Sequence, residues 1–539
     1  MAMDYSQPYP SQRSPVLARR VVCASQPLAA QAGLRMMLQG GNAVDAAVAA
    51  AIASTVVEPT ANGVGSDAFA VVWDGARLHG LNASGRAPAM WDPARFAGAQ
   101  AMPRRGWDSV TVPGAVSSWV ELCRRFGKLP FEQLFEPAVD YARYGFAVSP
   151  IIGALWQRIA PNYADQPGFA EAFLPGGRAP APGEIFRNAP LAATLEAIAA
   201  TRGEALYRGA LGEALVAHAA RHGGAMTMDD LASHRAQWCG TLSQRIADVD
   251  VHEIPPNTQG IATLIALGIL ERHDLRRHDV DGVDALHLQI EAMKLAFADV
   301  EAFVGDPESM AIDPRALLSE AYLDARAALI DPRRAGDFGA GAPRQGGTVY
   351  LAAADADGMM VSFIQSNYEG FGSGIVVPGT GISLQNRGMG FSLQAGHPNR
   401  VGPRLRPLHT IGFRVFAVGS NEQAASICGI RVHRVKIAAF AICGTLAGLA
   451  GFLLAARLQS GQPTAGEFYE LTAIAAVVLG GAALKGGEGK LFNSVVGVFI
   501  MVLLGNVLNL AGVGTYWQRV AVGLVIVAAA AADQLRHRR

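Results

Sequence analysis

Residues 346–366 read Gly-Gly-Thr-Val-Tyr-Leu-Ala-Ala-Ala-Asp-Ala-Asp-Gly-Met-Met-Val-Ser-Phe-Ile-Gln-Ser. Residues 348–354 predict a short strand, because they open with residue types that favour the extended conformation. Asp355 and Gly358 then predict a tight turn, since aspartate bonds its own backbone and glycine tolerates positive φ. Residues 359–365 predict a second strand. The segment therefore predicts a β-hairpin whose first strand begins with a threonine directly after two glycines.

The sequence around this hairpin is typical of a mixed α/β globular domain. Residues 42–57 predict a buried helix, with Asn42 as its N-cap and alanine and valine filling the turns that follow. Residues 69–73 predict another short strand. Residues 1–20 are rich in serine, proline and arginine, and we expect a poorly ordered arm there. The globular pattern runs from residue 21 to about residue 411.

Length and charge indicate two folding units of different character. The chain has 539 residues, which is too long for one ordinary core, and its formal net charge is zero. Residues 412–539 hold 11 basic and 5 acidic residues, which leaves 34 basic and 40 acidic residues for the rest. A mildly acidic domain argues against nucleic-acid binding, which needs a basic face. We therefore expect no nucleic-acid partner.

The cysteines exclude two common kinds of site. There are five, an odd number, they are far apart in the sequence, and no pair has Cys-x-x-Cys spacing. Neither a structural zinc site nor a disulfide framework is indicated, and a reduced compartment fits this usage. We expect no metal and no cofactor. The first 34 residues hold no unbroken apolar core of signal-peptide length, so we expect no secretion signal.

Four apolar stretches follow the globular region, at residues 437–456, 471–484, 492–510 and 520–532. A bilayer core of ~30 Å takes about 20 helical residues. The first and third stretches meet this length, and the other two reach it with flanking residues such as Tyr469, Tyr516 and Trp517, which suit the membrane interface. We predict an all-α segment of about four transmembrane helices. The alternative is that these are buried helices of a large water-soluble core.

The basic residues of this region predict its orientation. They precede the first span, lie between the second and third, and follow the fourth: Arg431, Arg434, Lys436, Lys485, Lys490, Arg536, Arg538 and Arg539. The other two loops hold only Arg457 and Arg519. Because basic loops stay on the cytoplasmic side, both ends of the segment are expected there. The sequence thus predicts a multi-pass protein of the cell membrane, with the lipid bilayer as a partner and the N-terminal domain cytoplasmic.

Five segments of the globular region resemble hallmarks of the gamma-glutamyltransferase family: Gly40-Gly41-Asn42-Ala43-Val44-Asp45-Ala46-Ala47-Val48, Val112-Pro113-Gly114-Ala115-Val116, Phe371-Gly372-Ser373-Gly374, Pro378-Gly379-Thr380-Gly381-Ile382 and Arg406-Pro407-Leu408-His409-Thr410. They stand in the order of that family and span about residues 21–411. The resemblance implies an N-terminal-nucleophile (Ntn) hydrolase fold of four layers, αββα. It also implies a precursor that cuts itself before a threonine.

The resemblance places that threonine at Thr348, with autocleavage between Gly347 and Thr348. Residues 21–347 would then form the large-subunit region and residues 348–411 the beginning of the small subunit. A threonine hydroxyl is a weak nucleophile, but cleavage frees an α-amino group of pKa ~8 beside it that can act as general base. The alternative, from the residue alone, is an ordinary strand threonine.

Further site residues follow from the same resemblance. Ser366 falls where the family has a hydroxyl that bonds the nucleophile; otherwise it is a serine on a polar strand face. Asn386 either holds a polar group of the substrate or caps a turn. Tyr368 and Arg387 complete the expected substrate-binding set on this side, and Arg387 replaces a glutamine of the family.

Other positions depart from the family pattern. Ser84 stands where classical members hold the glutamyl carboxylate with an arginine, although Arg86 is near. Classical members also bind the α-amino group of the substrate with an aspartate that precedes a phenylalanine. In this chain Gly390 precedes Phe391 at that position. A ligand ammonium without that carboxylate loses a charged hydrogen bond worth ~1.5–3 kcal/mol. The site is thus more similar to the oxamate-amidohydrolase-like branch, in which a small anionic amide, rather than a gamma-glutamyl-like substrate, would lie near Arg387.

The C-terminal segment carries a second resemblance, to permease subunits of ribose-type sugar ABC transporters. It rests on Ala417-Val418-Gly419-Ser420-Asn421-Glu422-Gln423-Ala424-Ala425, Cys428-Gly429-Ile430, Gln462-Pro463-Thr464-Ala465-Gly466, Ala473-Ile474-Ala475-Ala476-Val477-Val478-Leu479-Gly480-Gly481 and Tyr516-Trp517-Gln518. It covers residues 412–539 and implies two partners, a second permease chain and an ABC transporter ATPase. The chain has no Walker Gly-x-x-x-x-Gly-Lys-Ser/Thr motif of its own.

Both halves look truncated against these families. Only 64 residues run from Thr348 to Ile411, and the family's Gly-Gly turn, whose amides stabilise the oxyanion, is not among them. Three functions remain open. The chain is a membrane-tethered Ntn amidohydrolase, a transport permease component with a soluble remnant, or a nonfunctional chimera of two truncated genes.

Overall fold

The computed structural model describes residues 18–278, 282–336, 338 and 347–409. They belong to the first of two units of the chain, residues 1–412. None of the described helices is long and apolar enough to cross a bilayer. The four predicted spans, between residues 437 and 532, lie outside the described residues.

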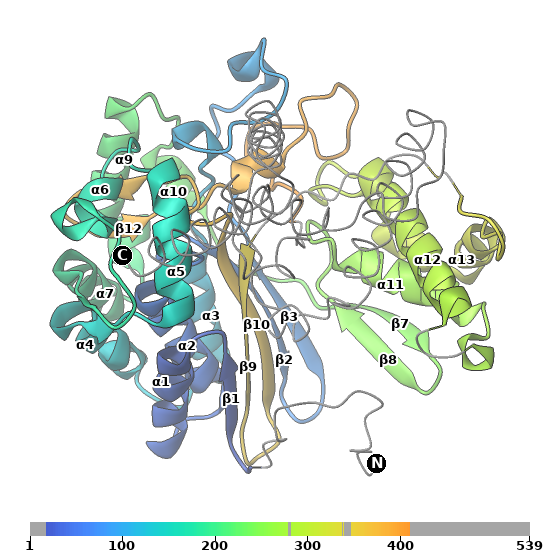
Figure 1. Cartoon of the computed structure of the whole chain (residues 1–539), viewed down its shortest axis with the longest axis horizontal. Coiled ribbons are helices and arrows are strands. Elements are labelled where there is room, and N and C mark those ends of the chain that lie inside the picture. Colours follow the sequence, from blue (N-terminus) through green and yellow to red (C-terminus); the bar gives the residue numbers. More distant parts are fainter. Residues whose placement is uncertain (1–17, 279–281, 337, 339–346, 410–539) are drawn as a thin grey trace, which may run out of the picture. The chain divides into compact units, whose positions relative to one another are not determined.

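A six-stranded sheet forms the centre of this unit (Figure 1). Its spatial order is β1 (Val21–Ala24), β9 (Gly347–Ala354), β10 (Met360–Tyr368), β2 (Asp67–Trp73), β3 (Leu78–Ala83) and β6 (Gln237–Trp238), with antiparallel neighbours throughout. The predicted hairpin is confirmed as β9 and β10, at the middle of the sheet. The predicted strand at residues 69–73 is confirmed as β2.

One face of the sheet is covered by helices, and the most buried of them is α2 (Ala43–Val57). All 15 of its residues are buried, so its Ala/Val-rich sequence needs no polar face. The predicted N-cap is confirmed, because Asn42 and Asp45 form a reciprocal capping box. The Oδ2 atom of Asp355 accepts a hydrogen bond of 2.9 Å from the Ala43 amide, so the hairpin turn is tied to the helix N-terminus.

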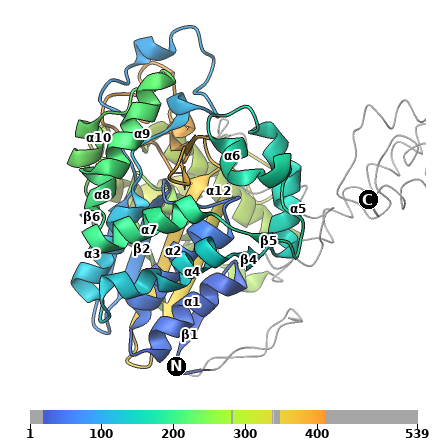
Figure 2. The ribbon, with the colours of Figure 1, turned by 90° about the vertical axis from the view of Figure 1, so that its left-hand side faces the viewer.

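The remaining helices of this side share the hydrophobic core of α2 (Figure 2). They are α1 (Pro27–Leu38), α3 (Ala115–Phe126), α4 (Glu136–Tyr144), α5 (Pro150–Ile159), α6 (Phe169–Phe173), α7 (Ala189–Thr201), α8 (Glu204–Tyr207), α9 (Ala210–Arg221) and α10 (Met228–Ser233). Two pairs of two-residue strands complete the region: β4 (Phe146–Ala147) with β5 (Ile185–Phe186), and β11 (Val376–Val377) with β12 (Ile382–Ser383).

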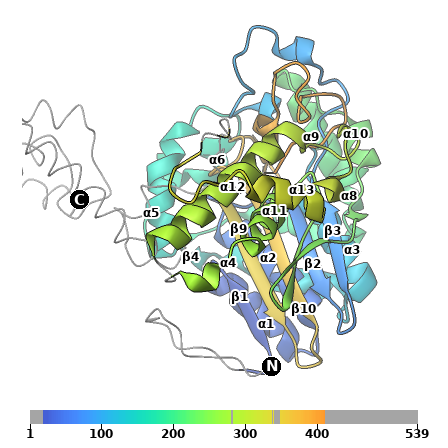
Figure 3. The same cartoon turned by 90° about the vertical axis from the view of Figure 1, so that its right-hand side faces the viewer.

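A second, smaller core lies on the opposite face of the sheet (Figure 3). The hairpin β7 (Leu242–Ile246) and β8 (Val249–Glu253) packs against α11 (Gly260–Glu271), which in turn packs against α12 (Val283–Phe303) and α13 (Glu320–Ala327). The layers are therefore α, β, β and α, as predicted. In the described part of the chain the second β layer holds only these two strands.

Part of the central sheet is left open by this short second layer. Trp73, Tyr350 and Met360 lie on the face away from α2 and line a hollow of about 470 Å³. Tyr350 is 53% and Met360 52% exposed, which is unusual for large apolar side chains in the middle strands of a sheet. A fuller second sheet would bury such a surface.

Candidate active site

The regular ladder of the central hairpin breaks at the predicted nucleophile. Val349 pairs with Gln365, and Gly347 pairs with Tyr368, so that two residues of β10, Ser366 and Asn367, lie opposite the single position Thr348. This is a β-bulge, a feature that re-aims side chains beside active sites. Tyr368 has a φ of +80°, a backbone conformation that residues other than glycine rarely adopt.

A glycine-rich loop brings a second segment against this end of β10. A Cβ on Gly65 would lie 2.3 Å from the Ser383 carbonyl oxygen, and one on Gly63 would lie 2.1 Å from Ser383 Oγ. The backbone contact leaves no room for a side chain at Gly65, and at Gly63 the Ser383 hydroxyl would have to move, so glycine permits the close approach. The loop that follows Ser383 carries Arg387, which is thereby placed beside the bulge.

Four buried side chains, Asp67, Ser366, Arg387 and His409, meet here and form what we call the charged cluster. Arg387 donates to Ser366 Oγ through Nη2 at 3.2 Å and to Asp67 Oδ1 through Nε at 3.4 Å. Asp67 Oδ2 lies 2.7 Å from Nε2 of His409. Ser366 Oγ also accepts a bond of 2.8 Å from the Tyr368 amide. The cluster thus reaches from the first residue of β2 to the bulge opposite Thr348.

The protonation of the cluster follows from its contacts. Burial alone would raise the pKa of Asp67, but His409 and Arg387 together hold it below its ordinary value. Burial, and next the charge of Arg387, lower the pKa of His409 to about 4, against the opposing effect of Asp67. At neutral pH the cluster therefore holds one guanidinium, one carboxylate and a neutral imidazole, with zero net charge.

Arg387 keeps one donor for a ligand. Its Nη1 atom is buried and has no hydrogen-bond partner among the described residues. Its guanidinium carbon lies 4.4 Å from the centre of the Tyr368 ring, a cation–π contact that fixes the plane of the fork. A buried donor left unsatisfied is costly. The arrangement suits an acceptor, above all an anionic oxygen, that arrives with a substrate.

The other predicted site residues have different surroundings. The Asn386 side chain accepts from the Glu369 amide at 3.2 Å and donates to the Arg104 carbonyl at 2.9 Å, so it ties two loops together. Ser84 is fully buried, and its Oγ donates to Asn82 at 2.7 Å.

Arg86 is engaged by groups outside the charged cluster. It donates to the Arg404 carbonyl oxygen and to Glu308, both at 2.7 Å. The structure therefore brings Ser366, Tyr368 and Arg387 to the backbone position of Gly347 and Thr348, and gives Ser84 and Arg86 contacts outside the charged cluster.

Sequence reasoning missed two members of the cluster, Asp67 and His409. Asp67 opens a buried strand directly after the glycine loop, and an acidic residue at such a place needs a partner. His409 stands inside the segment Arg406-Pro407-Leu408-His409-Thr410, which was used only as a family mark. A search for a counter-charge to Arg387 would have pointed to Asp67.

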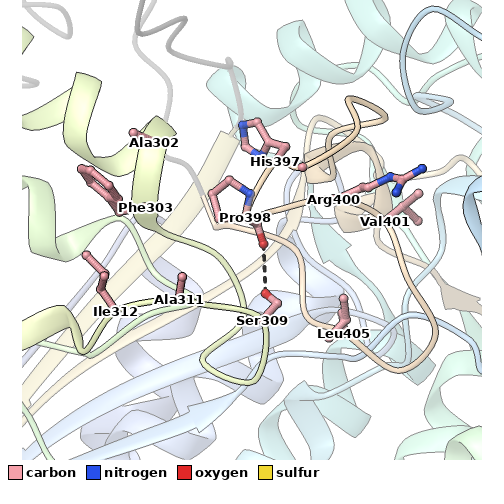
Figure 4. Close-up of a pocket in the computed structure, with 11 residues that line it drawn as sticks. Ala302, Phe303, Ser309, Ala311, Ile312, His397, Pro398, Arg400, Val401 and Leu405 are labelled. Atoms are coloured by element: carbon pink, nitrogen blue, oxygen red, sulfur yellow. Dashed lines mark hydrogen bonds between the residues drawn. The ribbon is translucent and has the colours of Figure 1, made fainter.

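Another hollow, of about 400 Å³, lies between the end of α12 and the loop of residues 396–405 (Figure 4). Ser309 Oγ donates to the Pro398 carbonyl oxygen at 2.9 Å across one side of it. None of the predicted site residues lines this hollow. In the described ranges, no group of three or more His, Cys, Asp or Glu side chains is arranged to hold a metal ion.

Comparison with known proteins gives a family match for each of two regions of the chain. Residues 29–417 match the family described as Gamma-glutamyltranspeptidase. Residues 409–530 match the family described as Branched-chain amino acid transport system / permease component. The first match covers well over half of the chain, whereas the second covers a shorter C-terminal part.

Individual relatives agree with the first match. The chain is 37% identical over 406 residues to the glutathione hydrolase-like YwrD proenzyme of Bacillus subtilis, covering 74% of this chain and 76% of that protein. The identity and coverage are the same for the oxamate amidohydrolase proenzyme of Klebsiella pneumoniae. Overall identity therefore does not separate the two activities.

A solved structure supports the same relationship. The crystal structure of cephalosporin acylase from Bacillus halodurans superposes with a TM-score of 0.70 at 45% sequence identity, and the match covers 76% of this chain and 77% of that one. Fold, family match and relatives agree on an Ntn hydrolase with hydrolase or acylase activity. Over residues 29–417, the chain belongs to the gamma-glutamyltranspeptidase family.

Proposed function

We propose that the N-terminal domain is an amidohydrolase of the oxamate-amidohydrolase-like branch, with Thr348 as nucleophile and a small anionic amide as substrate. The observation that carries the proposal is the buried guanidinium of Arg387, which keeps Nη1 unpartnered in the described part of the chain, at the bulge opposite Thr348. A substrate carboxylate would satisfy this donor with a charge-assisted hydrogen bond.

The charges of the site disfavour a gamma-glutamyl substrate. Such a substrate carries an ammonium group, which needs a free carboxylate. The two described carboxylates in contact with this region are already engaged, because Asp67 lies against Arg387 and His409, and Glu369 binds Arg104 at 2.7 Å. Gly390 offers no side chain at the position where the family has an aspartate.

The proposed chemistry depends on Thr348 becoming the N-terminal residue of a new chain after self-cleavage. The Thr348 hydroxyl attacks the amide carbonyl while its proton passes to the free α-amine. Collapse of the tetrahedral intermediate expels ammonia, which takes that proton, and leaves an ester on Thr348. Water then hydrolyses the ester and releases a carboxylate, so that oxamate and water give ammonia and oxalate. Arg387 holds the substrate carboxylate throughout and positions the carbonyl by the nucleophile.

Self-cleavage at Gly347–Thr348 must precede this cycle, because it frees the amine. We expect turnover to be slow, since the Gly-Gly turn of the family's small subunit has no counterpart before residue 411. Removing one oxyanion donor from an acyl-transfer site lowers turnover by ~10²–10³-fold. Substrate binding at Arg387 does not depend on that turn and is expected to persist.

The substrate proposal is tested with the full chain purified in detergent. Oxamate, its neutral analogue oxamide, and glutathione are incubated with the wild type and with Thr348→Ala, and ammonia and glutamate are assayed. We expect slow ammonia release from oxamate that Thr348→Ala abolishes, and no glutamate from glutathione. Glutamate release without ammonia from oxamate would assign the site to the glutathione-hydrolase activity instead.

We further propose that residues 412–539 anchor this domain to the cell membrane through about four helices, as a ribose-type sugar permease segment with the catalytic domain in the cytoplasm. The match of residues 409–530 to a transport permease family supports a membrane segment. After alkaline carbonate extraction the chain should stay in the membrane pellet, and its release would contradict the anchor. Capture of a transport ATPase and a second permease chain on the tagged protein tests the partners.

A further inference from the structure

Four arginines line a small pocket on the side of the domain that carries α10 and β6. Its volume is about 230 Å³, and the arginines are Arg86, Arg235, Arg404 and Arg406. They come from three separate segments: the chain after β3, the link between α10 and β6, and the chain before His409. Such a concentration of guanidinium groups around one hollow is a feature that neither the hairpin nor the charged cluster explains.

The deepest of these side chains is Arg406, which is only 4% exposed. Its Nη2 donates to the amide oxygen of Gln237 at 2.9 Å, and its Nε donates to the Ser84 carbonyl at 3.4 Å. Both acceptors are neutral. Among the described residues no carboxylate lies within 4.0 Å of this guanidinium, although a buried cation normally has a counter-charge.

Arg235, at the rim of the pocket, also has a guanidinium that binds only neutral acceptors in the part of the chain that is described. Its Nη1 donates to the carbonyl oxygens of Ala232 and His234, at 2.7 and 2.6 Å, and it too has no carboxylate partner in the described ranges. The two remaining arginines are neutralised, since Arg86 binds Glu308 at 2.7 Å and Arg404 binds Asp229. Two of the four guanidiniums, those of Arg235 and Arg406, therefore have no direct ion pair among the described residues, although the buried Asp306 lies 3.7 Å from Arg86 and accepts from the Arg406 amide at 2.7 Å.

The acidic group on the pocket wall makes no ion pair with either guanidinium. Asp230 lines the pocket, but its Oδ1 accepts from the Ala89 amide at 2.9 Å and its Oδ2 accepts from the amide and hydroxyl of Thr227. His234 also lines the pocket. Burial and, next, the positive charges of Arg406, Arg86 and Arg235 lower the pKa of His234 to about 3. The hollow is thus lined by four guanidiniums, two of them without a direct ion pair in the described part of the chain, and has a buried floor.

We propose that this pocket binds a doubly charged tetrahedral oxyanion, either inorganic phosphate or the phosphate group of a small metabolite. The guanidiniums of Arg235 and Arg406, which have no direct ion pair among the described residues, can each pair with an oxygen of a phosphate, which carries a charge of about −1.5 to −2 at pH 7. Arginine forks bind phosphate oxygens in bidentate fashion. A carboxylate holds its oxygens in one plane, whereas a tetrahedral anion presents four oxygens in different directions to donors from three separate segments.

Titration calorimetry of the full chain with inorganic phosphate, against chloride at matched ionic strength, tests the proposal. Phosphate and sulfate should bind, and chloride should not. The planar dianion oxalate should bind at least tenfold more weakly than phosphate. Arg235→Gln should weaken phosphate binding about tenfold or more, and Arg235→Lys, which keeps the charge but not the fork, should give an intermediate affinity.

Arg245→Gln is the matched control, because Arg245 is an exposed arginine that pairs with Asp250 on the β7–β8 hairpin and does not line the pocket. It should bind phosphate like the wild type. A phosphomonoester such as phenyl phosphate, if tighter than inorganic phosphate, assigns the site to a metabolite, and the reverse order assigns it to the free anion. Equal phosphate affinity of wild type and Arg235→Gln, or equal binding of chloride, would overturn the proposal.

Discussion

Replacing Arg387 with glutamine removes the donor on which the proposed substrate preference depends. The substitution deletes the unpartnered Nη1 and the positive charge but leaves a polar group that can still reach Ser366. A hydrogen bond between charged groups contributes ~1.5–3 kcal/mol, which corresponds to a loss of about 10- to 150-fold in affinity for oxamate. The neutral analogue oxamide makes no such contact, so its affinity should change little.

The same substitution has a pH-dependent effect on stability. Asp67 would keep only His409, whose Nε2 lies 2.7 Å from its Oδ2. Removing one partner of a buried ion pair typically costs ~3–5 kcal/mol. Arg387 is one cause of the low pKa of His409, so its loss lets the imidazole take up a proton and replace the missing charge. The destabilisation should therefore be larger at pH 8 than at pH 5.5.

The assay is calorimetric binding of oxamate and oxamide to the full chain, combined with urea unfolding at the two pH values. Arg178→Gln is the control, since Arg178 is exposed and pairs with Glu184 at the surface, where ion pairs contribute about 0–1 kcal/mol. It should leave both readouts unchanged. If Arg387→Gln keeps the ratio of oxamate to oxamide affinity within about twofold of the wild type, the carboxylate is not held by this residue.

Three further substitutions test how three buried groups affect the free energy of unfolding, measured by denaturant unfolding. Burial raises the pKa of Glu58 to about 7, so the folded wild type loses stability as pH rises from about 4.5 to 7 and this carboxyl ionises. Glu58→Gln cannot ionise, so it should be more stable than the wild type at pH 8, by up to ~3 kcal/mol. Near pH 4.5 the two proteins should be equally stable. The lowered pKa of His409 makes the wild type lose stability as pH falls from 6.5 to about 4. His409→Gln should reduce that loss by ~3 kcal/mol. An unchanged dependence of stability on pH would refute the claim that His409 is buried as a neutral imidazole. Asn42→Ala removes the N-cap of α2 and a 2.6 Å bond to the Phe126 carbonyl, and should destabilise the domain by about 2 kcal/mol, whereas a change below about 0.5 kcal/mol would show that the cap is dispensable.

The local elements of the fold were predictable because their signals are local. The turn at Asp355 and Gly358 and the strands on either side of it follow from residue types within the hairpin itself. The observed second strand runs three residues further than predicted, to Tyr368, because the bulge lets polar residues stay in the sheet. Asn42 was identifiable as a cap since both members of its capping box lie within one turn of helix.

The charged cluster could not be predicted because its members are brought together by the fold alone. Asp67 and Arg387 are 320 residues apart, and their contact requires the close approach of the glycine loop to Ser383. Sequence could place Arg387 near a substrate only by resemblance. For Asn386, the observed bonds to Glu369 and Arg104 tie two loops together, and its role toward a substrate stays a prediction.

The central claim, that Thr348 becomes a nucleophile by freeing its own amine, is tested most directly by intact mass and N-terminal sequencing of the purified full chain. We predict two fragments, residues 1–347 and 348–539, with threonine at the start of the second. Thr348→Ser should still be cleaved because it keeps the hydroxyl, and Thr348→Ala should stay whole. A wild-type chain that remains uncut at Gly347–Thr348 after prolonged incubation would contradict the account.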